Sequence, residues 1–273
     1  MRHNCSVTAF DFAKGHGTGN DFVIIPDPAD RIELSAAQVA ALCDRRRGIG
    51  GDGLLRVAPS EDGEAEWFMD YRNADGSIAE MCGNGVRVFA RYLLEQGMAD
   101  GDRIPVATRA GVRAVTVTGD ELSVDMGPAE FGPASQATVD DLTWTGRAVS
   151  MGNPHLVCQV ADEAQLDSLD LHRQPGYDNA VFPEGVNVEF VAGSAPRVRM
   201  RVHERGVGET LSCGTGACAV GAVALRLAGT PTGVCEVEVP GGTVTVTVTE
   251  RTVHLAGPAV IVAEGTVRLQ RPL

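Results

Sequence analysis

The chain reads CGNGVRVFARYLLEQG from residue 82 to residue 97. Apolar residues recur there at helical spacing and a glycine ends the pattern, so a helix is expected to begin directly after Cys82. Cys213 precedes a second stretch of this kind, whose helical pattern runs from Ala217 to Leu227 and is also closed by a glycine. The sequence therefore predicts two helices, each with a cysteine at its N-terminus.

The two halves of the chain share three short motifs in the same order. They are GNDF at 19–22 and GNPH at 152–155, GDGL at 51–54 and GVNV at 185–188, and CGNG at 82–85 and CGTG at 213–216. Three matches in one order at a nearly constant offset are hard to obtain by chance, and this offset is far longer than the period of a solenoid repeat. The pattern indicates a duplicated domain.

Outside these two helices the pattern is mostly alternating and β-branched, with one further helix expected at 35–43. The clearest predicted strands are at 112–117, 198–202 and 243–249. Each half is therefore expected to be a strand-rich α+β domain. The first domain is predicted to span 1–127 and the second 128–259, with the junction in the proline- and glycine-rich stretch Gly127–Pro133.

The net charge and the composition of the chain argue against several classes of binding partner. The 273 residues carry a net charge of −13 and a pI near 4.9, which argues against nucleic acid and anionic membranes as partners. No apolar stretch approaches the ~20 residues that a membrane helix needs, and residues 1–12 lack the apolar core of a signal peptide, so a cytoplasmic location is expected. Seven cysteines include no C-x-x-C pair, which argues against a zinc site and a disulfide framework.

The placement of Cys82 and Cys213 suggests proton-transfer chemistry. A helix N-terminus carries partial positive charge and unpaired N–H groups, so it binds anions and favours a thiolate. If the two domains face each other, one thiol would lie on each side of a single bound carbon. Inverting a stereocentre by proton transfer requires a base on one face and an acid on the other, and the helix N-termini would stabilise the carbanion. The residues therefore favour an amino-acid racemase or epimerase.

Other interpretations exist for the cofactor and for the supporting groups. Many amino-acid racemases hold pyridoxal phosphate on a lysine, but Lys14 is the only lysine and no phosphate-binding loop accompanies it. We therefore expect no cofactor and no metal. His155 has the alternative interpretation of a satisfied core or surface histidine. Glu204 and Arg205 have the alternative of a surface ion pair worth ~0 to 1 kcal/mol.

One stretch carries a resemblance to a known family. Residues 73–87 read NADGSIAEMCGNGVR and match every fixed position of the signature N-x-D-G-S-x(4)-C-G-N-[GA]-x-R, so the chain resembles the diaminopimelate epimerases. The resemblance spans nearly the whole chain, because it continues at 15–22, 152–155, 185–188 and 204–216. One departure is Gly53, where many members have glutamine.

The resemblance implies a fold, an activity and a set of site residues. The fold is two pseudo-symmetric domains, each a mixed β-sheet around a central helix, with the strand at about 260–273 packing with the first domain and the active site between the domains. The activity is cofactor-independent interconversion of LL- and meso-diaminopimelate, in lysine and peptidoglycan precursor biosynthesis. The implied catalytic residues are Cys82, Cys213, His155 and Glu204. The implied substrate-binding residues are Asn20, Asn73, Gly83, Asn84, Asn153, Asn187, Glu204, Arg205, Gly214 and Thr215. A homodimer and an oxidised Cys82–Cys213 disulfide are further expectations.

Three other functions remain as alternatives. Proline racemases and hydroxyproline epimerases share the paired cysteines, but they usually carry C-G-H after the first cysteine, where this chain has Cys82-Gly83-Asn84. Their small substrates also need no clamp for a distal carboxylate, which Arg205 would supply. A non-catalytic amino-acid-binding protein would have no reason to place a thiol at both helix starts. A phenazine-pathway isomerase of similar fold would lack the cysteine pair.

Overall fold

Alternating and β-branched stretches form strands throughout the computed structural model, which describes residues 7–61 and 63–270. The chain makes two compact units. One consists of the residues up to Gly17, Asp21–Val117 and the segment from Ala259 onward, and the other consists of Thr18–Asn20 and Thr118–Pro258. Within the described residues, the elements are strand-rich with few helices, which agrees with the expected α+β class.

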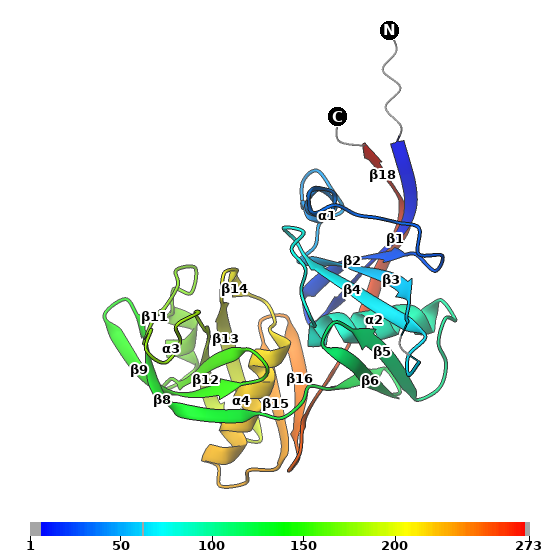
Figure 1. Cartoon of the computed structure of the whole chain (residues 1–273). Helices are drawn as coiled ribbons and strands as arrows, with labels where there is room; N and C mark the ends of the chain where they lie inside the picture. The colour runs from blue at the N-terminus through cyan, green and yellow to red at the C-terminus, as the bar shows by residue number, and fades with distance from the viewer. Residues whose placement is uncertain (1–6, 62, 271–273) are drawn as a thin grey trace. The chain divides into compact units, whose positions relative to one another are not determined.

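The first unit holds two of the expected helices. Its elements are β1 (Val7–Gly17), β2 (Asn20–Pro26), α1 (Ala36–Cys43), β3 (Gly53–Pro59), β4 (Trp67–Asn73), α2 (Gly83–Glu95), β5 (Arg103–Thr108), β6 (Gly111–Thr118) and β18 (Val260–Gln270). β2 and β3 run parallel, β3 and β4 antiparallel, β4 and β5 parallel, and β5 and β6 antiparallel. α2 packs against β1, β3, β4, β5 and β18 (Figure 1).

The second unit repeats this order of pairings. Its elements are β7 (Glu121–Asp125), β8 (Glu130–Val139), β9 (Leu142–Ser150), β10 (Pro154–Gln159), α3 (Glu163–Ser168), β11 (Gly176–Tyr177), β12 (Asn187–Ser194), β13 (Arg197–Glu204), β14 (Gly208–Thr210), α4 (Gly214–Leu227), β15 (Gly233–Val239), β16 (Gly242–Val248) and β17 (Val253–Gly257). β10 and β12 are parallel, β12 and β13 antiparallel, β13 and β15 parallel, and β15 and β16 antiparallel. The shared pattern is the structural counterpart of the three repeated motifs.

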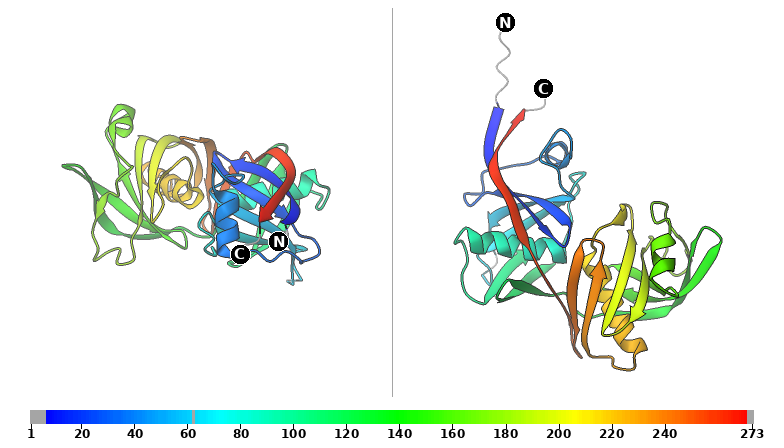
Figure 2. Two further views of the ribbon diagram at one scale, coloured as in Figure 1. Left: turned by 90° about the horizontal axis from the view of Figure 1, so that it is seen from above. Right: turned by 180° about the vertical axis from the view of Figure 1, so that it is seen from behind.

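The two ends of the chain meet in the first unit, where β18 pairs antiparallel with β1 along nearly its full length (Figure 2). The boundary between the two units lies earlier in the chain than the expected position at residue 127. The second unit begins at Thr118 and takes in β7, because β7 pairs antiparallel with β17. The stretch Gly127–Pro133 lies inside the second unit, where the Gly127 carbonyl accepts a hydrogen bond from the Val253 N–H.

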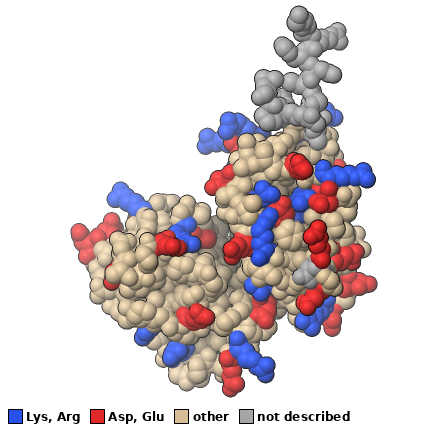
Figure 3. Space-filling view, viewed as in Figure 1, with Lys and Arg blue, Asp and Glu red and all other residues tan. Residues whose placement is uncertain are grey.

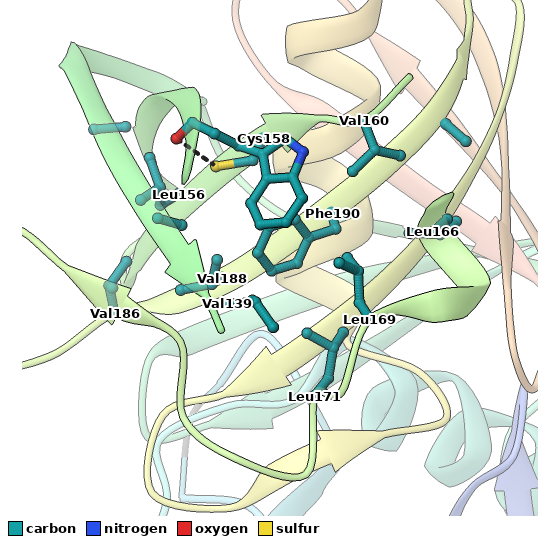
Figure 4. Packing of buried hydrophobic residues seen from close by; sticks show 14 of the residues in the cluster. Val139, Leu156, Cys158, Val160, Leu166, Leu169, Leu171, Val186, Val188 and Phe190 are labelled. Carbon is teal, nitrogen blue, oxygen red and sulfur yellow. Dashed lines mark hydrogen bonds between the residues drawn. The ribbon is translucent and has the colours of Figure 1, made fainter. Parts of the chain in front are cut away.

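Each unit buries its own apolar core. In the first unit, α1 begins with a capping box between Ser35 and Gln38 and covers apolar residues of β2 and β3. In the second unit, Trp144 and Phe190 pack edge to face, with ring centroids 5.3 Å apart, and both belong to the apolar cluster that surrounds Phe190 in Figure 4. These cores hold the strands whose ends carry the expected site residues.

α4 approaches its sheet closely because its inner face consists of small residues. A Cβ at Gly221 would lie 2.6 Å from Val246 of β16, so only glycine fits at this crossing. Ala217, Ala219 and Ala222 are also buried. The short distance between helix and sheet brings the N-terminus of α4 close to side chains of the strands beneath it.

Candidate active site

Cys82 is the N-cap residue of α2, with an extended backbone at φ −144° and ψ 120°. The Gly85 N–H donates to its sulfur across 3.4 Å, and the side chain remains partly exposed. An N-cap group that accepts from the helix amides lies where the positive end of the helix dipole stabilises negative charge. The structure therefore places this thiol as the sequence predicted, with access to solvent.

The first turn of α2 is held by a buried arginine. Gly83 and Asn84 are both buried, and the Arg87 guanidinium, which has 0% exposure, donates from Nη2 to Asn84 Oδ1 across 2.7 Å. The interaction fixes the Asn84 side chain at the N-terminus of the helix.

Two further predicted residues lie at strand ends. Asn73 ends β4, where its side chain donates to Ser77 and accepts from the Tyr71 hydroxyl across 3.0 Å. Asn20 begins β2 and belongs to the short segment that is grouped with the second unit. The missing glutamine at Gly53 has a steric reason, because a Cβ there would lie 2.7 Å from the Arg72 carbonyl oxygen and 2.8 Å from the Tyr71 ring.

Cys213 is the N-cap residue of α4, but its surroundings differ from those of Cys82. The side chain is buried, and within the described residues it makes no capping hydrogen bond. Its sulfur lies 3.6 Å from the Thr215 hydroxyl. Burial raises the pKa of the Cys213 thiol well above its usual value, and the carboxylates of Glu204 and Glu189 raise this pKa further. At neutral pH this sulfur is a thiol.

His155 connects with Cys213 through two other predicted residues. Its Nε2 lies 3.0 Å from Asn153 Oδ1, and Asn153 Nδ2 donates to the Thr215 hydroxyl across 3.3 Å. Thr215 in turn contacts the sulfur. The side chain of His155 is fully buried on β10. It is part of a connected polar group that reaches the Cys213 sulfur.

Asn187, Glu204 and Arg205 lie together at the adjoining strand ends. Asn187 Oδ1 accepts from the Arg205 N–H across 2.9 Å, and Asn187 Nδ2 donates to the Pro154 carbonyl at the same distance. Glu204 Oε1 accepts from the Thr210 hydroxyl. The Arg205 guanidinium donates to the Glu184 carbonyl across 3.1 Å. Asn187 thus ties the loop that carries Arg205 to the start of β10.

The structure adds one group that the sequence analysis missed. Glu189 lies on β12, directly after the GVNV motif, and its Oε1 contacts His155 Nδ1 at 2.6 Å. Both side chains have 0% exposure. A single acidic residue inside the otherwise apolar run from Val188 to Ala192 was the available signal.

Other kinds of site are poorly supported among residues 7–61 and 63–270. No group of three His, Cys, Asp or Glu side chains in that part of the chain is arranged to hold a metal ion. The described helices include none that is long and apolar enough to cross a membrane. On the face shown in Figure 3, acidic and basic side chains are interspersed and form no continuous basic surface.

Comparisons with known proteins agree on one family. The family model described as diaminopimelate epimerase matches residues 12–132 and 147–269. The chain is 51% identical over 278 residues to a diaminopimelate epimerase of Rhodococcus jostii, covering 94% of this chain and 96% of the relative. It is 52% identical over 282 residues to one of Streptomyces coelicolor, covering 94% and 95%. Among solved structures, a phenazine biosynthesis protein of Bacillus anthracis aligns with a TM-score of 0.74 at 17% identity, covering 95% and 99%, which shows a shared fold.

Proposed function

The chain belongs to the diaminopimelate epimerase family, and from that premise we propose that it interconverts LL- and meso-diaminopimelate with Cys82 and Cys213 as opposed acid and base. The family makes the protein an isomerase that acts on diaminopimelate, in the biosynthesis of lysine. The observation that supports the two-base scheme is the matched placement of the two cysteines as N-cap residues of α2 and α4.

The proposed reaction exchanges one proton on each face of the α-carbon. The thiolate of one cysteine forms an S–H bond as the Cα–H bond breaks, and the electron pair of that bond stays on carbon. The thiol of the other cysteine gives its proton to the opposite face, which forms the new Cα–H bond and leaves that sulfur as a thiolate. By family likeness, Cys213 acts as base toward the LL isomer and Cys82 toward the meso isomer.

The helix N-termini supply the stabilisation that the carbanion requires. Backbone amides at Gly83 and Asn84, and at Gly214 and Thr215, would hold the reacting carboxylate with two partial positive charges. These residues form the first turns of α2 and α4. The arrangement raises the acidity of the α-proton without a prosthetic group.

The remaining predicted residues would bind the far end of the substrate and support the cysteines. Arg205 offers a forked donor for the distal carboxylate. Asn20, Asn73, Asn153 and Asn187 would bind the distal amine and carboxylate. Glu204 and His155 would support proton transfer at Cys213, since His155 is connected to it and Glu204 affects its pKa.

One experiment tests this function directly. Purified protein is incubated with LL-diaminopimelate in D2O, and the deuterium content and stereoisomer ratio of the product are followed by mass spectrometry and chiral chromatography. We expect deuterium at the inverted carbon, with no exchange in L-proline under the same conditions. Turnover of proline in place of diaminopimelate would favour the proline racemase alternative. Binding without deuterium entry would favour a binding protein.

A pyridoxal enzyme is the other mechanism to test. Lys14 forms an ion pair with Asp21 at 2.5 Å and also donates to the Gly50 carbonyl, so its amine is engaged in structural contacts. We expect hydroxylamine treatment to leave the activity unchanged. Inactivation by hydroxylamine that added pyridoxal phosphate restores would contradict the two-cysteine scheme.

We also propose that oxidation joins Cys82 to Cys213 when substrate is absent, because the mechanism requires both sulfurs to flank one carbon. A disulfide needs Cα atoms ~4.4 to 6.8 Å apart, which domain closure would have to provide. All six cysteines in the described ranges are free. Peptide mapping after mild peroxide treatment should find this crosslink, and dithiothreitol should restore activity. Fully inactivated protein without the crosslink would contradict it. A homodimer and a cytoplasmic location stay predictions.

A further inference from the structure

Glu189 is a buried acid that the two-base mechanism does not use. It lies on β12 at 0% exposure, in contact with His155 on the parallel neighbour β10. It also reaches the first turn of α4, since a Cβ on Gly216 would lie 2.7 Å from Glu189 Oε1 and 3.3 Å from the Cys213 sulfur. Glycine at that position leaves the room in which the carboxyl approaches the helix.

The hydrogen bonds beyond Glu189 run in one direction. Asn153 uses its amide nitrogen to donate to Thr215, so the amide oxygen faces His155 and can only accept. His155 must therefore carry a proton on Nε2. The Thr215 hydroxyl accepts from Asn153 and keeps its own hydrogen to donate to the Cys213 sulfur. Every donor between His155 and Cys213 thus points toward the sulfur.

The remaining question is which group holds the proton between His155 Nδ1 and Glu189 Oε1. Glu189 Oε2 has no hydrogen-bond partner among the described residues, although it is buried. An ionised carboxylate with one oxygen unpaired inside the protein is strongly disfavoured, whereas a neutral acid that donates through its other oxygen is tolerated. We propose that Glu189 is a neutral carboxylic acid that donates to His155 Nδ1, and that it thereby fixes the tautomer of His155 and the direction of the hydrogen bonds ending on Cys213.

The surrounding titratable groups support the neutral form. Burial raises the pKa of Glu189, and the negative charge of Glu204 raises it further, while His155 opposes both effects. The thiol of Cys158, on the strand beside Glu189, stays neutral because burial raises its pKa to about 12. Cys213 at the start of α4 is a thiol at neutral pH.

A neutral Glu189 has a consequence for catalysis, and this part rests on the proposed function. Each carboxylate beside Cys213 makes its thiolate harder to form, so removal of one negative charge helps this sulfur to act as a base. The Thr215 hydroxyl then stabilises the thiolate through the hydrogen bond that the His155 tautomer sets up. Glu189 is therefore a positioning residue for Cys213.

Two substitutions of Glu189 separate its role as a hydrogen-bond donor from its role as an ionisable acid. Glu189→Leu removes the donor, so we expect kcat/KM to fall on the order of 10- to 100-fold, the range typical of residues that orient an active-site histidine. Glu189→Gln restores an N–H donor without an acid, so it should recover most of that loss. Glu238→Gln is the matched control. Glu238 lies exposed on β15 and pairs with Arg199, so this substitution should leave activity unchanged. Equal impairment of the Gln and Leu variants would overturn the proposal.

Infrared spectroscopy gives a readout that needs no turnover and no Leu variant. The difference spectrum of unmodified protein minus Glu189→Gln at pH 7 should contain the carbonyl stretch of a protonated carboxylic acid. The spectrum for Glu238→Gln should contain only carboxylate bands. A carboxylate band for Glu189 would overturn the inference even if the epimerase is active. Absence of deuterium entry into diaminopimelate, with the acid band present, would instead count against the proposed function alone.

Discussion

Cys82 and Cys213 are N-cap residues of equivalent helices, but their surroundings are opposite in character. Cys82 is partly exposed, accepts a hydrogen bond from the Gly85 N–H, and lies on the helix that also carries the buried cation of Arg87. Cys213 is buried, lies beside Glu204 and Glu189, and has a raised pKa. The duplication therefore preserved the position of the thiol and changed the charge around it.

Under the proposed two-base scheme, this difference would give two residues of the same type opposite roles as acid and base. Two identical thiols in identical surroundings would have equal tendencies to lose a proton. Burial and the Glu204 carboxylate keep Cys213 protonated at neutral pH, whereas the amide that donates to Cys82 favours its thiolate. The comparison predicts a resting enzyme with its proton on Cys213.

The largest effect should come from removing either thiol. Cys82→Ala or Cys213→Ala should lower kcat by ~10²- to 10⁴-fold, because each sulfur transfers a proton in the proposed reaction. Cys43→Ala and Cys235→Ala are matched controls, since both residues are buried and burial raises the pKa of each thiol to about 11. Steady-state assays in both directions measure the effect. Substantial activity in either Ala variant at the site would contradict the two-base scheme.

The next effect concerns the second unit, which carries Arg205, the proposed clamp for the distal carboxylate. Arg205→Met should lower kcat/KM by roughly 10- to 150-fold, equal to the ~1.5 to 3 kcal/mol of a hydrogen bond to a charged group. Arg173→Met is the control, because Arg173 is exposed and pairs only loosely with Asp170 at 3.8 Å. Thermal unfolding should show that both variants fold. An unchanged kcat/KM would remove Arg205 from the binding site.

Alkylation would sharpen the comparison between the two thiols. At pH 7, iodoacetamide should label Cys82 at least ~10-fold faster than Cys213, since only the thiolate reacts and Cys213 is buried with a raised pKa. Labelling of Cys213 should increase as pH rises above the usual thiol range. Mass spectrometry of the two peptides gives both rates in one sample. Equal rates at pH 7 would show that the resting proton is not on Cys213.

The smallest effect on activity, with a measurable effect on stability, is expected at Asp70 in the first unit. Arg56, Arg72 and Arg109 contact its carboxylate, and against the opposing effect of burial Arg72 and Arg109 hold its pKa down to about 2. A lowered pKa contributes stability above the unfolded value near ~3.9 that is lost as pH falls toward 2. Asp70→Asn should reduce the free energy of unfolding by ~1 to 3 kcal/mol at pH 7 and by less at pH 3. Urea titrations at both pH values measure this, and a pH-independent loss would contradict it.

The sequence alone was sufficient for the local structure around the two cysteines. Helical spacing after Cys82 and Cys213 predicted α2 and α4, and alternation at 112–117, 198–202 and 243–249 predicted β6, β13 and β16. These features are local, because periodicity and turn residues act within a few residues of chain. The repeated motifs also anticipated the repeated strand pairings.

Long-range pairing was decided by the tertiary structure. The packing of β18 with the first unit was expected only because of the family resemblance. The pairing of β7 with β17 places the start of the second unit at Thr118, before the expected boundary. The chain around β7 carries no local signal of its partner, since a strand can pair with any compatible edge. Register between distant strands depends on which faces are buried, and that is a property of the whole fold.

The site shows the same division. The motif spacing pointed to the two thiols, and the family resemblance supplied the asparagines and Arg205 as expected binding residues. The role of Glu189 could not be predicted from the sequence. A single acid in an apolar strand can be either unpaired or hydrogen-bonded to a neighbour, and the neighbouring strand must be known to decide between the two. The contact with His155 exists because β10 and β12 are parallel neighbours, and burial by the fold gives that carboxyl its raised pKa. The sequence determined which groups are present, and the tertiary structure decided which of them carry the charge, because desolvation and distance arise only when the chain is folded.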